Sequence, residues 1–125
     1  MSDPIRILHL EDDPNDAELI ALQLESDHLV CRIENVASEK EFSRALDLNT
    51  VDLILADNTG PTFTGHTALA LARKKYPQVP LIFVSGAGDS KDATRAIEAG
   101  ASGYVLKDRL SDLAPCIRAA LHLPL

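Results

Sequence analysis

The chain of 125 residues contains no tryptophan, and aromatic residues make up only 4% of it. So few aromatic side chains leave no platform on which nucleotide bases could stack. Positive charge is also scarce, because 12 lysines and arginines face 19 aspartates and glutamates and give a net charge of −7. This balance argues against nucleic acid or an anionic membrane as a direct partner.

Cysteine is rare as well. Cys31 and Cys116 show neither the spacing of a metal site nor that of a redox motif, so we expect both to be small buried residues in a reducing compartment. No apolar run is long enough to span a bilayer, and no secretory signal is recognisable. These absences predict a cytoplasmic protein with no membrane partner.

The most informative stretch runs from Val51 to Gly65. A run of apolar residues there ends abruptly in Asp57, and a loop rich in glycine, proline and threonine follows. A short apolar run bounded by breakers is typical of a strand buried on both faces. Asp57 then lies at the carboxyl end of that strand, where open α/β sheets place their ligand crevice.

Four further apolar runs and five helical patterns complete the chain. We expect strands at Ile5–Leu10, Leu29–Asn35, Val51–Asp57, Leu81–Ser85 and Ser102–Leu106. Helices are expected at about 14–25, from a capping box at 38–41 onward, at 64–76, from 89 or 90 to 100, and at 110–121. In the fourth helix, Ala93, Ala96 and Ile97 are expected to face inward. The pattern continues throughout, which predicts one domain over residues 1–125 with an ordered core at about 4–122.

Five strands alternating with five helices predict a single five-stranded parallel sheet with helices on both faces. Its strand order is either 2-1-3-4-5, as in the flavodoxin-like doubly wound (βα)5 fold, or that of half a Rossmann fold. We favour 2-1-3-4-5, because polar residues cluster after the first and third strands and this order makes those strands neighbours.

Acids, a hydroxyl and a lysine follow the strands at their carboxyl ends. They are Glu11, Asp12 and Asp13 after the first strand, Asp57 after the third, Ser85 at the end of the fourth and Lys107 after the fifth. Two carboxylates about 4 Å apart repel by about 4 kcal/mol at an effective dielectric constant of about 20, and a divalent cation removes that cost. Oxygen ligands favour Mg²⁺. A lysine and a hydroxyl beside the metal suit a phosphoryl group, with Asp57 as the attacking nucleophile.

With these residues, the chain resembles a response-regulator receiver domain of two-component signalling over essentially its whole length. The resemblance is carried by Glu11-Asp12, Asp57 followed by Gly60-Pro61 and Gly65, Ser85 before Gly86-Ala87, and Gly100-Ala101 with Tyr104-Val105-Leu106-Lys107. It implies that Asp57 is the phosphoacceptor, and that Glu11, Asp12, Asp57 and the backbone carbonyl of Thr59 hold Mg²⁺ or Mn²⁺. It also implies that Ser85 is the switch hydroxyl, Lys107 the phosphate-binding lysine and Tyr104 the aromatic residue that moves with Ser85.

The same resemblance implies a phosphorylation-controlled switch rather than an enzyme, although such a domain assists its own phosphorylation and dephosphorylation. The phosphoryl group would come from a histidine kinase, a phosphotransfer protein or a small phosphodonor. An output partner would bind the face formed by the fourth helix, the fifth strand and the fifth helix. No output domain is recognisable in this chain, and residues 121–125 resemble the start of a linker, so we expect a receiver cut from a longer protein.

Three positions depart from the family pattern. Gly60 stands where methionine is usual before Pro61, and Asp108 stands where a proline in a cis peptide usually follows the lysine. A cis bond before a residue other than proline costs about 2.5–4 kcal/mol, so we expect a locally different or a strained turn after Lys107. Asp13 is either a third metal ligand or the cap of the first helix.

Three other functions are weighed against the switch. A phosphohydrolase that uses an aspartyl phosphate would need a second aspartate where Thr59 stands. A flavin carrier would need a phosphate-binding loop where Glu11, Asp12 and Asp13 stand. A pseudo-receiver that is never phosphorylated and serves only as a docking module stays open because of Asp108.

The four histidines form no ligand set. His9 lies on the same face of its strand as Ile5 and Ile7, which predicts a core residue or one that supports the site. His28 and His122 are expected at the surface.

Overall fold

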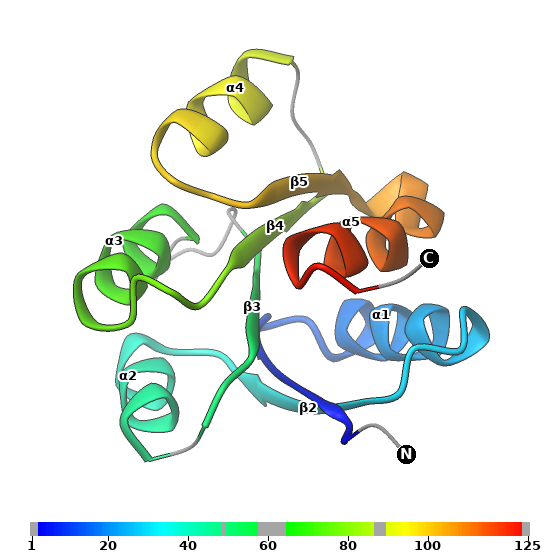
Figure 1. Ribbon diagram of the computed structural model, residues 1–125, viewed down its shortest axis with the longest axis horizontal. Helices are drawn as coiled ribbons and strands as arrows, with labels where there is room; N and C mark the ends of the chain where they lie inside the picture. The colour runs from blue at the N-terminus through cyan, green and yellow to red at the C-terminus, as the bar shows by residue number, and fades with distance from the viewer. Residues whose placement is uncertain (1–2, 49, 58–64, 87–89, 124–125) are drawn as a thin grey trace.

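The computed structural model describes residues 3–48, 50–57, 65–86 and 90–123 (Figure 1). In chain order the elements are β1 (Ile5–Leu10), α1 (Pro14–Ser26), β2 (Cys31–Val36), α2 (Glu39–Leu48), β3 (Leu53–Ala56), α3 (Gly65–Lys75), β4 (Leu81–Ser85), α4 (Ser90–Glu98), β5 (Gly103–Leu106), the 3-10 helix η1 (Lys107–Asp112) and α5 (Leu113–Ala120).

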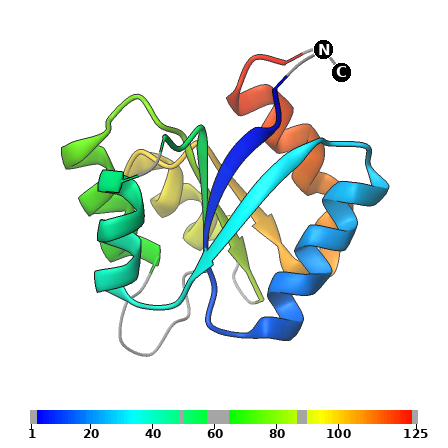
Figure 2. The same cartoon turned by 90° about the horizontal axis from the view of Figure 1, so that it is seen from below.

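The strands form one parallel sheet in the order β2-β1-β3-β4-β5, which confirms the predicted topology. Helices α1 and α5 cover one face of the sheet, and α2, α3 and α4 cover the other (Figure 1). All strands point toward the edge at which α1 begins, as the view in Figure 2 makes clear. The carboxyl ends of the strands therefore meet at one edge, where the predicted site residues lie.

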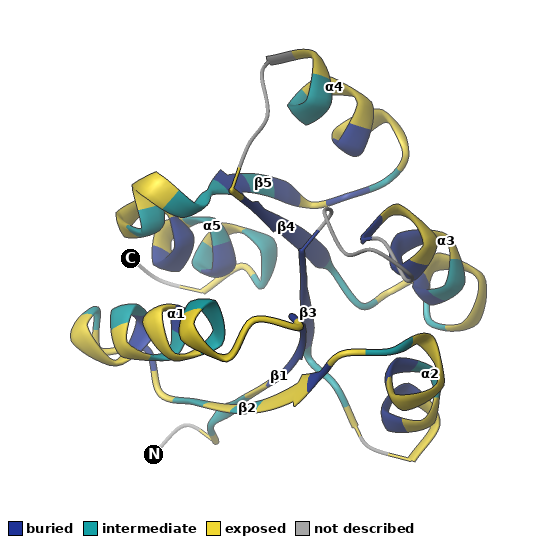
Figure 3. Cartoon of the chain, turned by 180° about the vertical axis from the view of Figure 1, so that it is seen from behind, coloured by how far each residue is buried: buried dark blue, intermediate teal, exposed yellow. Residues whose placement is uncertain are grey.

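The core is divided by the sheet into two apolar layers. Every residue of β3 and β4 is buried, whereas β2 at the edge has several exposed residues (Figure 3). One layer holds Phe42 and Phe83 with α2 and α3, and the other holds Leu24 and Ile117 with α1 and α5. Each such side chain contributes about 1.5–3 kcal/mol on burial, so the two layers fix the sheet edge in place.

Two helix starts follow the capping rules closely. Asp13 caps α1, because its Oδ1 accepts a hydrogen bond from the Asn15 N–H at 2.9 Å, and Pro14 is the first helical residue. The predicted capping box is present before α2, where the Glu41 N–H donates to Ser38 Oγ at 3.2 Å. Glu41 in turn accepts a hydrogen bond from the Ala37 N–H at 3.2 Å.

Some predicted boundaries differ from the structure. The third strand is shorter at both ends than predicted, and the Arg6 N–H donates to the Asp52 carboxylate at 2.9 Å just before it begins. The last α-helix begins three residues later than predicted, because η1 occupies its expected first turn. Pro115 still falls in the first turn of α5, where its missing N–H leaves no bond unmade.

Burial predictions failed at three places. Ile97 is 49% exposed instead of facing the core, because the short helix α4 turns only Ala96 fully inward. Cys31 and Cys116 are only partly buried. Within the described ranges, no helix combines the length and apolar character of a membrane span.

Candidate functional site

The site is built on the neighbouring strands β1 and β3. Their register pairs Leu10 with Ala56, so the next residues, Glu11 and Asp57, follow side by side. The backbone fixes both positions, because the Asp57 N–H donates to the Leu10 carbonyl at 3.0 Å and the Glu11 N–H donates to the Val36 carbonyl at 2.9 Å. The two carboxylates are thus held by the sheet itself rather than by a loop.

Three carboxylates gather at this edge. One oxygen from each of Glu11, Asp12 and Asp57 lies within 4.8 Å of the others. Glu11 and Asp57 are buried, with side chains 1% and 8% exposed, whereas Asp12 is exposed to solvent. The structure therefore brings together the three predicted acidic side chains.

The geometry of these oxygens fits a hard divalent cation. Ligands of octahedral Mg²⁺ at about 2.0–2.1 Å from the ion lie about 3–4 Å apart, so the three oxygens, which lie within 4.8 Å of one another, would draw closer together around a bound ion. The donors are all carboxylate oxygens, which Mg²⁺ and Mn²⁺ prefer. Glu11, Asp12 and Asp57 are the side chains that would hold such an ion, and waters would take the remaining positions.

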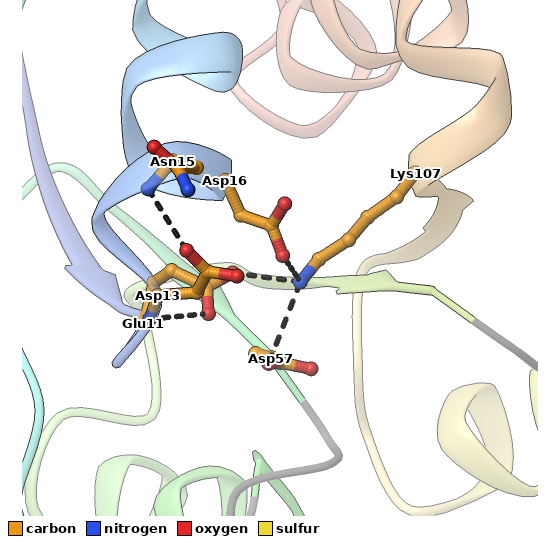
Figure 4. Close-up of polar contacts among 6 residues, drawn as sticks. All are labelled: Glu11, Asp13, Asn15, Asp16, Asp57 and Lys107. Atoms are coloured by element: carbon orange, nitrogen blue, oxygen red, sulfur yellow. Dashed lines mark hydrogen bonds and ion pairs between the residues drawn. The ribbon is translucent and has the colours of Figure 1, made fainter.

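Lys107 reaches into the same crevice from the end of β5 (Figure 4). Its Nζ lies 2.6 Å from Asp16 Oδ2, 2.8 Å from Glu11 Oε1 and 3.5 Å from Asp57 Oδ2. Burial alone would lower the pKa of Lys107, but the hydrogen bond to Asp16, the close contact with Glu11 and the charges of Glu11 and Asp57 outweigh it and raise that pKa. The lysine is therefore a fixed positive charge among three negative ones.

Glu11 is the most buried member of the set. Its Oε2 accepts a hydrogen bond from the Asp13 N–H at 3.2 Å, and its Oε1 makes the ion pair with Lys107 without an aligned hydrogen bond. Burial raises the pKa of Glu11, against the opposing effect of Lys107. Asp13 itself caps α1 and is not one of the three clustered carboxylates.

The turn after Lys107 departs from the family pattern as expected. No cis peptide bond occurs in the part of the chain that the structure describes, and Lys107 begins the 3-10 helix η1. Arg109 interrupts that helix with φ −133° and ψ 47°. Despite the replacement of proline by Asp108, the Lys107 side chain is aimed at Asp57.

Ser85 and Tyr104 occupy the predicted strands. Ser85 ends β4, pairs in register with Leu106 and is fully buried. Tyr104 is half-buried on the opposite side of the sheet from α1, with its ring centroid 6.2 Å from that of Phe83. Their switch roles remain predictions. Thr59 and the Gly60-Pro61 pair lie outside the described residues.

Gly65 allows the first residue of α3 to pack against the backbone of Asp57. A Cβ at this position would lie 2.9 Å from the Asp57 carbonyl oxygen and would collide with the Phe83 ring. The resemblance named Gly65 only as part of a motif, and the structure supplies the reason for a glycine there. It lets the acceptor strand and α3 approach each other closely.

His9 lies beneath the site and is fully buried, as predicted. Neither of its ring nitrogens has a hydrogen-bond partner of good geometry among the described residues. Burial, helped by the charge of Lys107, lowers the pKa of His9 to about 4, although Asn35 opposes the shift. The ring is therefore neutral at pH 7 and supports the sheet beneath the site without adding charge.

Asp16 is the site residue that the sequence reasoning missed. It lies in the first turn of α1 and makes the shortest of the three carboxylate contacts with Lys107. The one available signal was that Asp16 lies in the first helical turn after the acidic run 11–13, which places it near the carboxyl end of β1. Its partner lies 91 residues away, and no local pattern identifies such a pair.

Comparison with known proteins agrees with this architecture. The family described as response regulator receiver domain matches residues 7–117. Response regulator protein TodT of Pseudomonas putida is 32% identical over 124 residues, which are 98% of this chain and 54% of that protein. The chain thus spans about half the length of the curated relative it matches.

Solved receiver domains have the same fold. One is the receiver domain of a signal transduction histidine kinase from Syntrophus aciditrophicus, with 28% identity, a TM-score of 0.78, and coverage of 94% of this chain and 89% of that one. Another is a CheY-like receiver domain protein from Methanospirillum hungatei, with 26% identity, a TM-score of 0.81, and coverage of 96% and 95%.

Proposed function

The chain belongs to the response regulator receiver domain family of two-component signalling, and we propose that it is a switch controlled by phosphorylation of Asp57. The observation that carries the proposal is the meeting of Glu11, Asp12, Asp57 and Lys107 at one sheet edge. The domain boundaries stay a proposal too: one receiver unit over residues 1–125, with its ordered core at about 4–122.

Asp57 is the nucleophile in this proposal. One of its carboxylate oxygens forms a bond to phosphorus, while the bond between phosphorus and the donor's leaving group breaks and its electron pair departs with that group. Lys107 neutralises charge on the transferred group, and Ser85 donates a hydrogen bond to one of its oxygens. The buried setting of Asp57 strengthens these interactions relative to water.

The three carboxylates are proposed to hold Mg²⁺ or Mn²⁺, with the Thr59 carbonyl as a further ligand. When bound, the ion supplies Lewis-acid stabilisation of the transferred phosphoryl group. Glu11 and Asp57 orient their oxygens from fixed strand ends, and exposed Asp12 leaves a side of the site open to solvent and donor. The chain assists its own phosphorylation and dephosphorylation but has no separate substrate.

The partners are proposed from the faces around the site. A histidine kinase or phosphotransfer protein would dock beside the acceptor, and exposed Leu19 and Leu22 on α1 could add apolar contacts. An output partner would use the face of α4, β5 and α5, where Ile97 is exposed on α4. Inward movement of Ser85, followed by Tyr104, would couple phosphorylation to that face. The cytoplasmic location stays a prediction.

The test is to incubate the protein with Mg²⁺ and acetyl phosphate and to measure intact mass at neutral pH. We expect a labile phosphoryl adduct that requires Mg²⁺ and is absent from Asp57→Ala. Asp52→Asn is the matched control, because Asp52 lies at the opposite end of β3 and should leave the adduct unchanged. No adduct would favour the docking module, and turnover of many phosphate esters would favour a hydrolase.

A further inference from the structure

Asp16 contacts Lys107 directly, yet the proposed phosphotransfer assigns it no role. We propose that Asp16 is a positioning residue that holds Lys107 in a resting arrangement, in competition with the phosphoryl group, and so limits phosphorylation of Asp57. This inference rests on the proposed function and adds a chain-specific regulation of the same site.

The distances place the resting lysine closer to Asp16 than to the acceptor. Lys107 Nζ is 2.6 Å from Asp16 Oδ2 and 3.5 Å from Asp57 Oδ2, and in the view of Figure 4 these two carboxylates lie on different sides of the ammonium. Asp16 projects from the first turn of α1, which the Asp13 cap and Pro14 hold rigid. The contact is therefore fixed at both ends by secondary structure.

The number of N–H donors on Lys107 explains why a phosphoryl group must compete with the carboxylates for the ammonium. An ammonium has three N–H donors, and the resting lysine already faces three carboxylates. A phosphoryl group on Asp57 presents several oxygens, so it gains a second donor only if Lys107 releases Glu11 or Asp16.

Burial decides which of the two partners is released. The Glu11 side chain is 1% exposed and is almost out of reach of solvent, whereas the Asp16 side chain is 30% exposed. A carboxylate that water can reach gives up its partner at lower cost than a buried one. Phosphorylation should therefore break the Asp16 contact and keep the Glu11 contact.

Charge acts in the same direction. The transfer replaces one negative charge on Asp57 with about two on the phosphoryl group. The Asp16 carboxylate adds repulsion to that group and to an anionic donor. Replacing Asp16 with asparagine, the neutral isostere of aspartate, should therefore favour the phosphorylated state both by freeing Lys107 and by removing this repulsion.

The experiment compares wild type, Asp16→Asn, Asp16→Glu and Glu25→Gln at saturating Mg²⁺. One readout is the initial rate of adduct formation from acetyl phosphate, and the other is the dissociation constant of beryllofluoride, an acyl-phosphate mimic. Glu25→Gln removes the same charge from α1, but about 13 Å farther along the helix and beyond the Debye length of about 8 Å. Thermal unfolding checks that every variant is folded.

We expect Asp16→Asn to be phosphorylated roughly three- to tenfold faster than wild type and to bind beryllofluoride more tightly by a similar factor. Asp16→Glu, which can keep the ion pair, should stay near wild type, and Glu25→Gln should not differ from it. The side-chain ammonium signal of Lys107 in NMR spectra should shift in Asp16→Asn and not in Glu25→Gln. A general loss of stability would not produce this selective shift.

Unchanged or slower phosphorylation of Asp16→Asn would overturn the inference and leave the proposed function intact. Slower phosphorylation would mean that Asp16 holds Lys107 in its productive position. If wild type itself formed no adduct and bound no beryllofluoride, the proposed function would fail, and the inference would fail with it because nothing would compete for Lys107.

Discussion

Replacing Lys107 with methionine removes the only positive charge that contacts Glu11, Asp16 and Asp57 among the described residues, while keeping most of the side-chain volume. The variant leaves Glu11 buried without its cation. Because water cannot reach that carboxylate, we expect a substantial loss of folding free energy at pH 7 in the absence of divalent cations.

The size of the loss follows from burial. Removing one partner of a buried ion pair costs about 3–5 kcal/mol. Lys107 is 17% exposed and Asp16 is 30% exposed, so water compensates part of the change, and we expect a loss of about 2–3 kcal/mol. For a domain of this size, that corresponds to a decrease in melting temperature of about 6–15 °C.

Divalent cations and protons should each restore the lost stability. Mg²⁺ at about 100 times its dissociation constant stabilises the folded state by about 2.7 kcal/mol, and it should stabilise Lys107→Met more than wild type because no ammonium competes for the oxygens. Burial raises the pKa of Glu11, so the folded state takes up a proton before the unfolded chain does. Stability of the variant should therefore rise relative to wild type as pH falls from 7 toward 5.

The assay is urea unfolding followed by circular dichroism, without Mg²⁺ and with Mg²⁺ at about 10 mM. Lys75→Met is the matched control, because its ion pair with Asp47 lies at the surface, where such pairs add little stability, and far from the proposed Mg²⁺ site. The reasoning is refuted if Lys107→Met loses no more stability than Lys75→Met, or if Mg²⁺ stabilises it no more than wild type.

Three further predictions concern the scaffold, and each is checked by urea unfolding. Because the pKa of His9 is lowered to about 4, wild type should lose up to about 3 kcal/mol relative to His9→Leu as pH falls from about 6.5 to about 4, and a pH-independent difference would contradict this. Gly65→Ala should cost about 1–3 kcal/mol, because its Cβ meets the Phe83 ring and a backbone oxygen, and an unchanged midpoint would show that the contact relaxes freely. Ser38→Ala should cost about 1 kcal/mol through the lost cap of the Glu41 N–H, whereas Ser38→Thr, which keeps a hydroxyl that both accepts and donates, should retain most of the stability.

The topology could be predicted from the sequence because chemistry and hydrophobicity pointed to the same arrangement. Apolar runs that each end in a polar residue place Glu11, Asp57, Ser85 and Lys107 at one sheet edge only if the strands are parallel. The requirement that the acids lie together then selected 2-1-3-4-5 from the two possible orders. The predicted order is the one observed.

What the sequence could not give were contacts set by the reach of side chains and by packing between distant segments. The Asp16 contact depends on where η1 delivers a lysine 91 residues later, and no periodicity encodes that. Ile97 has the spacing of a core residue, yet α4 turns it outward, because helical spacing defines a face without fixing which part of that face the sheet covers. Asp108 signalled an unusual turn but not that the turn is a 3-10 helix.

The unequal distances of Lys107 from Glu11 and Asp57 give a physical reason for the proposal that Asp57, rather than Glu11, is the nucleophile. Both carboxylates are buried at adjacent strand ends, but the ammonium is 2.8 Å from Glu11 and 3.5 Å from Asp57. Coulomb attraction and hydrogen bonding both weaken with distance, so Asp57 keeps more of its negative charge available for an electrophile. Glu11 also accepts a hydrogen bond from the Asp13 N–H, which engages its second oxygen. Of these two carboxylates, the one farther from the Lys107 ammonium is therefore the better placed to attack phosphorus.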